Sequence, residues 1–100
     1  MRVRLVILGL PPRTPQPRAN RFVQKFYGQD AITRSGRYRY RKAGLLDGLP
    51  HRKLRRGVVV LRERDWPKVE AFLRDWGADF EVRVIKPTPE DLSALAEPAH

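Results

Sequence analysis

Residues 57–86 constrain the fold more than any other part of the chain. Residues 57–61 are a β-branched run typical of a buried strand, and residues 80–86 alternate between apolar and polar side chains as a second strand would. Between them, four apolar residues recur at helical spacing: Val69, Phe72, Leu73 and Trp76. Asp65 is the expected N-cap of this helix, and Gly77 is its expected end. The sequence therefore predicts a strand–helix–strand unit.

The first half of the chain predicts a similar unit less regularly. Residues 2–10 form the expected first strand, with Val3, Leu5 and Ile7 on one face. Four prolines follow and forbid regular strand pairing: Pro11, Pro12, Pro15 and Pro17. Residues 18–27 then carry apolar side chains at helical spacing and predict the first helix.

Residues 37–42 alternate strictly and predict a half-buried strand. Tyr38 and Tyr40 fall on one face of this strand. Three arginines fall on the other face: Arg37, Arg39 and Arg41. We expect the tyrosines to face the helices, which turns the arginines toward solvent. In the alternative orientation the tyrosines face solvent, where they can stack on bases.

The order of predicted elements is βαββαβ, which is the split-βαβ or ferredoxin-like arrangement. In this α+β sandwich, two helices pack on one face of a four-stranded antiparallel sheet, and the other face is open. We expect a single domain over residues 1–87, with Phe80, Val82 and Val84 turned inward. Residues 88–100 add a short C-terminal helix and tail, which a capping-box-like pattern opens.

The charge of the chain is unevenly distributed. Residues 1–62 carry 16 Lys and Arg against two acidic residues, whereas residues 63–100 carry five against nine. This local excess of positive charge indicates a polyanionic partner such as nucleic acid. Arginine outnumbers lysine 16 to five. This preference suits phosphate binding because a guanidinium group can donate two hydrogen bonds to the oxygens of one phosphate. GC-rich coding or a hot habitat would also explain this preference, and a single asparagine, no cysteine and nine prolines fit a thermophile.

We expect an arginine-rich strand and a basic loop to contact the phosphate backbone. The expected binding residues are Arg37, Arg39, Arg41, Lys42, Arg52, Lys53, Arg55 and Arg56, together with Tyr38 and Tyr40. Three further cations would extend this surface: Arg13, Arg18 and Arg21. Structured RNA, including ribosomal RNA, is preferred over DNA, because a stiff proline loop and a basic loop beside a small α/β core resemble the build of many ribosomal proteins. The chain also has no helix-turn-helix or zinc-finger pattern that would indicate readout of duplex DNA.

Two segments resemble strands of the RNA-recognition motif family. Residues 5–12, Leu-Val-Ile-Leu-Gly-Leu-Pro-Pro, are similar to its first-strand motif, and residues 56–61, Arg-Gly-Val-Val-Val-Leu, are similar to the start of its third-strand motif. That family has the predicted topology and reads RNA on the open face of its sheet. Both segments carry valine or leucine where the family has aromatic residues that stack on bases. The resemblance therefore does not imply the family's single-strand readout.

Two other classes of function remain open. A small metal-dependent nuclease on a ferredoxin-like fold needs several converging carboxylates, and residues 1–62 offer only Asp30 and Asp47. Nucleases of this fold that are associated with CRISPR loci carry an aspartate at the end of the first strand, where residues 8–11 have no acid. A protein-interaction or assembly module would instead use the acidic second helix and tail. A homodimer is one form of such a module.

The sequence predicts no catalytic residue, metal site or cofactor. The chain has no cysteine, and its two histidines, His51 and His100, cannot complete a zinc site alone. It has no phosphate-cradling glycine loop, nucleophile elbow or dinucleotide fingerprint. It also has no apolar stretch long enough to span a membrane, so we expect no membrane partner and a cytoplasmic location.

Overall fold

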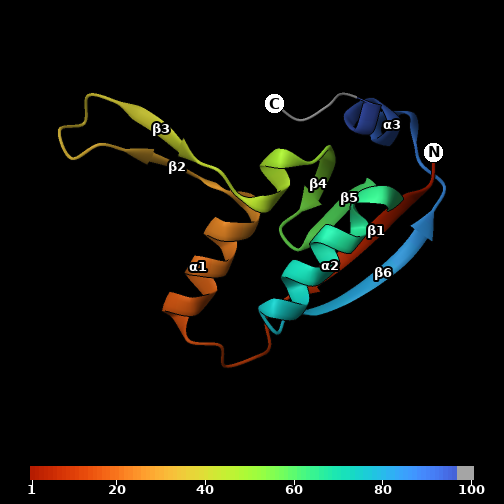
Figure 1. Ribbon diagram of the computed structural model, residues 1–100, viewed down its shortest axis with the longest axis horizontal. Coiled ribbons are helices and arrows are strands. Elements are labelled where there is room, and N and C mark those ends of the chain that lie inside the picture. The colour runs from red at the N-terminus through yellow and green to blue at the C-terminus, as the bar shows by residue number, and fades with distance from the viewer. Residues whose placement is uncertain (97–100) are drawn as a thin grey trace.

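The computed structural model describes residues 1–96 of the chain, which form a mixed α+β fold (Figure 1). Three helices accompany a four-stranded antiparallel sheet, and a separate two-stranded hairpin projects from them. The elements are β1 (Val3–Gly9), α1 (Gln16–Tyr27), β2 (Gln29–Ile32), β3 (Arg39–Lys42), β4 (His51–Arg55), β5 (Val58–Arg62), α2 (Trp66–Asp75), β6 (Asp79–Ile85) and α3 (Pro89–Ala96). Two short 3₁₀ turns, Leu45–Gly48 and Glu63–Asp65, precede β4 and α2.

The sheet has the strand order β4–β5–β1–β6, and each neighbouring pair is antiparallel. In its centre, Val6 of β1 lies opposite Val59 of β5 and Val82 of β6. Directly opposed residues share a face, so these three valines all point toward α1 and α2. The predicted alternation along β1 is confirmed, because Val6 is buried on this face and Val3 is buried on the other.

The sheet strand beside β5 is β4, and the prediction that residues 37–42 fill this place is wrong. Residues 51–56 are the densest basic run in the chain, and we expected a loop there. Two consecutive cations of this strand have partners on opposite faces of the sheet. The Lys53 ammonium lies 4.4 Å from the centre of the Tyr27 ring. On the opposite face, Arg52 donates to Asp91 Oδ1 at 2.7 Å.

The main core lies between the sheet and the two long helices. Phe22 and Phe26 of α1 stack with ring centres 5.7 Å apart, and Phe26 also stacks on Phe72 of α2 at 5.5 Å. Trp76 packs edge-on against Phe22, which confirms its predicted place in the core. Beneath these rings lie the buried sheet residues Val6, Val59 and Leu61.

Two local expectations in the second half are wrong. Val84 is 62% exposed because its register neighbour on β1 is Arg4, whose guanidinium donates to Glu63 at 2.7 Å. Asp65 is buried, but its carboxylate accepts a hydrogen bond from Arg62 Nε at 2.7 Å and does not cap α2. The tail beyond residue 96 lies outside the described residues.

Helix α3 covers one end of the other sheet face. Its Leu95 is buried with Val3 and Val60 in a second, smaller core. The predicted capping box at its start is confirmed: the Thr88 amide donates to Asp91 Oδ2 at 2.9 Å, and the Asp91 amide donates to Thr88 Oγ1 at 3.1 Å. No helix in residues 1–96 is long and apolar enough to cross a membrane.

Candidate nucleic-acid interface

Strands β2 and β3 form an arm that extends away from the rest of the molecule (Figure 1). Its register places Asp30 opposite Arg41, Ala31 opposite Tyr40, and Ile32 opposite Arg39. Asp30, Ile32, Arg39 and Arg41 therefore share one face, and Tyr40 lies on the other.

The tyrosines of the arm face solvent, so the expectation that they pack against the helices is wrong. Tyr38 is 68% exposed and Tyr40 is 47% exposed. The reason is topological. Because β3 pairs only with β2 within the described residues, neither α1 nor α2 lies over its tyrosine face. Both faces of the arm are consequently available to a ligand, one carrying arginines and the other carrying aromatic rings.

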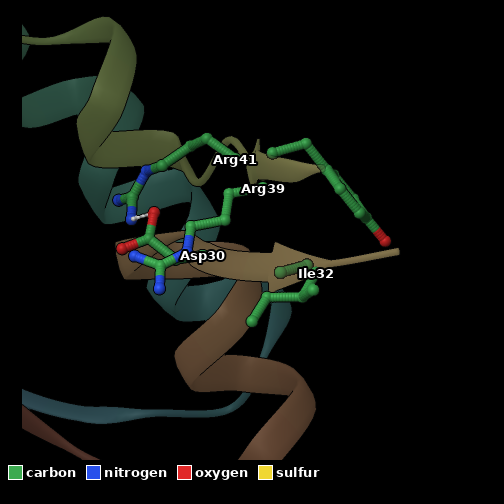
Figure 2. Close-up of a pocket in the computed structure, with 6 residues that line it drawn as sticks. Asp30, Ile32, Arg39 and Arg41 are labelled. Carbon is green, nitrogen blue, oxygen red and sulfur yellow. Dashed lines mark hydrogen bonds and ion pairs between the residues drawn. The ribbon is translucent and has the colours of Figure 1, made fainter. Parts of the chain in front are cut away.

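Arg41 ties the base of the arm to the body of the protein, and Figure 2 shows its ion pair with Asp30 inside the arm. Its guanidinium donates to the Tyr27 carbonyl oxygen at 2.7 Å, to Asp47 Oδ1 at 2.9 Å and to Asp30 Oδ1 at 3.3 Å. The hydrogen bonds to Asp47 and Asp30 raise the pKa of Arg41 above its ordinary value. Arg41, which we expected to contact phosphate, is therefore already engaged in positioning the arm.

Asp47 completes this tie from the 3₁₀ turn that follows β3. Burial of Asp47 opposes its ionisation, but hydrogen bonds from Arg41 and from the Gly44 amide outweigh that effect and lower the pKa of Asp47. The Gly44 amide donates to Asp47 Oδ2 at 2.8 Å. Gly44 also approaches the Gly28 backbone so closely that a Cβ at residue 44 would collide with it. Gly28 itself has a φ of 84°, a conformation that favours glycine.

The turn between β4 and β5 lies beside the base of the arm. Tyr27, the last residue of α1, accepts a hydrogen bond from the Gly57 amide at 2.7 Å through its hydroxyl oxygen. Burial raises the pKa of Tyr27, although this hydrogen bond and the charge of Arg56 act in the opposite direction. Arg56 lines a surface hollow together with Gly28 and Gln29, where the arm begins. The two basic segments therefore meet at the C-terminal end of α1.

Replacing Tyr27 by Phe tests this junction. The Tyr27→Phe variant keeps the ring that packs against Phe26 and Lys53, but it removes the acceptor of the Gly57 amide. We expect a loss of about 1–2 kcal/mol in the free energy of unfolding, measured by urea titration. Tyr38→Phe, on an exposed ring, is the matched control and should change stability by less than about 0.5 kcal/mol. Equal stabilities of the two variants would contradict the role given to Tyr27.

The expected binding residues differ in how far their charge is already neutralised. Arg52 is held by Asp91, Arg41 by Asp47 and Asp30, and Lys53 lies over an aromatic ring. In contrast, six cations of the arm and the β4–β5 turn make no ion pair within residues 1–96: Arg34, Arg37, Arg39, Lys42, Arg55 and Arg56. Arg34, at the tip of the arm, is an addition to the residues expected from the sequence.

The expected extension through the proline loop lies elsewhere on the molecule. Arg13 and Arg18 lie at the N-terminal end of α1, whereas the arm begins at its C-terminal end (Figure 1). A helix of 12 residues separates the two places by about 18 Å. Arg18 also donates to the Trp76 carbonyl oxygen at 2.9 Å and covers the Trp76 ring. These residues therefore form a surface apart from the arm.

Comparisons with protein-family models, curated proteins and solved structures find no significant match to this chain. Within residues 1–96, no three histidine or carboxylate side chains gather as they would around a metal ion.

Proposed function

We propose that this protein is a non-enzymatic nucleic-acid-binding protein whose principal contact is the β2–β3 arm, with structured RNA preferred over DNA. The observation that carries the proposal is the composition and exposure of the arm. Residues 29–42 hold five cations and one carboxylate, and their two tyrosines are exposed rather than packed in the core. Exposed rings and guanidinium groups on a projecting ribbon are the groups that stack on bases and bind phosphates.

The two faces of the arm have different tasks in this proposal. Arg39 of β3 binds one phosphate, and Arg37, in the bend just before β3, binds a neighbouring phosphate. Tyr38 and Tyr40 stack on bases from the opposite face. Arg55 and Arg56 extend the phosphate contacts beyond the base of the arm.

The preference for RNA follows from the tyrosines. Folded RNA offers unpaired bases in loops and bulges, and such bases stack on exposed aromatic rings. A two-stranded ribbon also fits the major groove of B-DNA, so duplex DNA is the competing ligand. In that groove, however, paired bases present their edges, and the rings of Tyr38 and Tyr40 would find no free base face.

We also propose that the four-stranded sheet, together with α1 and α2, is a ferredoxin-like arrangement. The arm is then an insertion in the chain between α1 and β4. The strand order β4–β5–β1–β6 and the antiparallel pairing support this assignment. So does the placement of both long helices against one sheet face.

The salt dependence of binding tests the proposed function. Affinity is measured by fluorescence anisotropy over a series of salt concentrations, with a bulged RNA stem-loop, a DNA duplex of matched length and an unstructured single strand. Six phosphate contacts predict a log–log slope of about −5 on a duplex and about −4 on a single strand. We expect the stem-loop to bind most tightly at every salt concentration. A slope near zero would overturn the proposal, and tighter binding to the DNA duplex would overturn the RNA preference alone.

A further inference from the structure

We propose that two copies of this chain associate through antiparallel pairing of their β6 strands, in a two-fold register centred on Val82. Strand β6 is the last strand in the sheet order, and within residues 1–96 no strand pairs with its outer edge (Figure 1). It is seven residues long and contains no proline or glycine. A long, unblocked edge of this kind presents free amide and carbonyl groups to another strand.

The side chains of β6 that the fold leaves uncovered are suited to a second copy. Val84 is 62% exposed although it lies on the same sheet face as the buried part of the core. On the opposite face, Glu81 and Arg83 form an ion pair at 3.3 Å, and their side chains are 63% and 62% exposed. The strand therefore offers an apolar residue on one face and charges of both signs on the other.

Charge selects one register for the pairing. In a two-fold pair centred on Val82, Glu81 lies opposite the partner's Arg83, and Arg83 lies opposite the partner's Glu81. Val84 lies opposite the partner's Phe80, and the two-fold symmetry repeats this apolar contact at a second position. A two-fold pair centred on residue 81 would oppose two glutamates, and one centred on residue 83 would oppose two arginines. Like charges directly opposed across strands destabilise a sheet, whereas opposite charges stabilise it.

The other edge of the sheet does not offer the same contact. The pairing of β4 with β5 shifts between Lys53 and Arg55, and such an irregularity twists an edge away from further strands. Each formally charged side chain of β4 is also basic, so two β4 edges would repel one another. Pairing β4 of one copy with β6 of another would leave a free β6 edge on the first copy and a free β4 edge on the second. Further copies could then add at both ends and generate an open chain of subunits. The β6–β6 pair closes as a dimer.

Charge reversal with rescue tests the register. Sedimentation velocity and light scattering give the dimer dissociation constant of the wild type, Glu81→Arg, Arg83→Glu and the double variant that carries both changes. We expect each single reversal to weaken the dimer at least about tenfold, because it opposes like charges at two symmetry-related positions. The double variant should recover most of this loss, because its opposed charges again have opposite signs. Circular dichroism of each variant verifies that the exposed substitutions leave the fold intact.

A second pair of variants tests the apolar contact. Val84→Lys should weaken the dimer at least about tenfold, since a lysine on an edge strand discourages pairing. Ile32→Lys, on an arm residue that is 57% exposed, is the matched control and should leave the dimer unchanged. A wild type that stays monomeric at the highest concentration it tolerates would overturn the proposal, as would a double reversal that fails to rescue. Nucleic acid takes no part in these measurements, so their failure is separable from failure of the proposed function.

Discussion

Substituting the four exposed residues at the outer end of β3 is expected to weaken RNA binding at least about 100-fold. The variant carries Arg37→Thr, Tyr38→Thr, Arg39→Thr and Tyr40→Thr. Two lost stacking contacts alone amount to about 2–6 kcal/mol, and two lost phosphate contacts add to that. The fold should survive, because these side chains are exposed and Arg41 still ties the base of the arm. Fluorescence anisotropy with the bulged stem-loop measures the loss.

A control variant with the same net charge distinguishes specific binding by the arm from general electrostatic attraction to the whole protein. Arg13→Thr with Arg21→Thr also removes two positive charges, one from the loop before α1 and one from the middle of α1. We expect this variant to lose less than about tenfold in affinity, since long-range attraction to phosphate is screened within about 10 Å at moderate salt. Equal losses in the two variants would show that the arm has no special role.

The two faces of the arm can also be separated with the same assay. Replacing only Tyr38 and Tyr40 should lower affinity without changing the salt slope, because stacking releases no counterions. Replacing only Arg37 and Arg39 should flatten the slope by about 1.5–2. A slope that changes with the tyrosines would contradict the assignment of phosphates to the arginine face.

The second large effect is expected at the start of α3, where Asp91→Ala should destabilise the protein by about 2–3 kcal/mol. The Asp91 carboxylate is only 4% exposed and accepts hydrogen bonds from the Thr88 amide at 2.9 Å and from Arg52 at 2.7 Å. Its removal breaks one of the two hydrogen bonds of the capping box and releases the edge strand β4 from α3. The midpoint of thermal unfolding should fall by roughly 10–20 °C. Glu90→Ala, which removes an exposed neighbouring carboxylate, is the control and should have little effect.

The contribution of Asp91 should depend on pH. The Thr88 amide, and then the Arg52 guanidinium, lower the pKa of Asp91 in the folded protein against the opposing effect of burial. A carboxyl group with a lowered pKa stabilises the fold fully above its unfolded pKa of about 4, and the stabilisation is lost as the pH falls through the folded value. The stability difference between wild type and Asp91→Ala should therefore be constant near neutrality and shrink below about pH 4. A difference that grows toward acid would contradict this account.

Periodicity predicted the second half of the fold well, because burial there is decided by local pattern. The helix around Val69 and Leu73 and the buried valines of β5 lie where the spacing of apolar residues indicated. The prediction that Val84 is buried failed because its surroundings depend on Arg4, a register neighbour far away in sequence. A period of two shows which residues share a face, but it does not show what covers that face.

The same limit explains the arm. The alternation correctly indicated a strand over part of its length, residues 39–42, but the strand is exposed rather than half-buried, and its partner strand was missed. Residues 29–32 precede a Ser35-Gly36 turn, and this turn could have indicated a hairpin. Residues 51–55 were missed as a sheet strand for a different reason. Arg52 and Lys53 have partners far away in sequence, such as Asp91, 39 positions from Arg52, and no local pattern contains that information.

The way in which the arm is attached bears on the angle at which the proposed ligand would be held. The two strands of the arm pair only with each other within residues 1–96, and the guanidinium of Arg41 attaches them to the rest of the protein at one end. The contacts of Arg41 with the Tyr27 carbonyl oxygen and with Asp47 therefore orient the arm at its base. Because Asp47 keeps its charge into mild acid, this attachment holds its direction across the neutral and weakly acidic range. In the proposed complex, the angle between nucleic acid and sheet would therefore be set largely by the free protein.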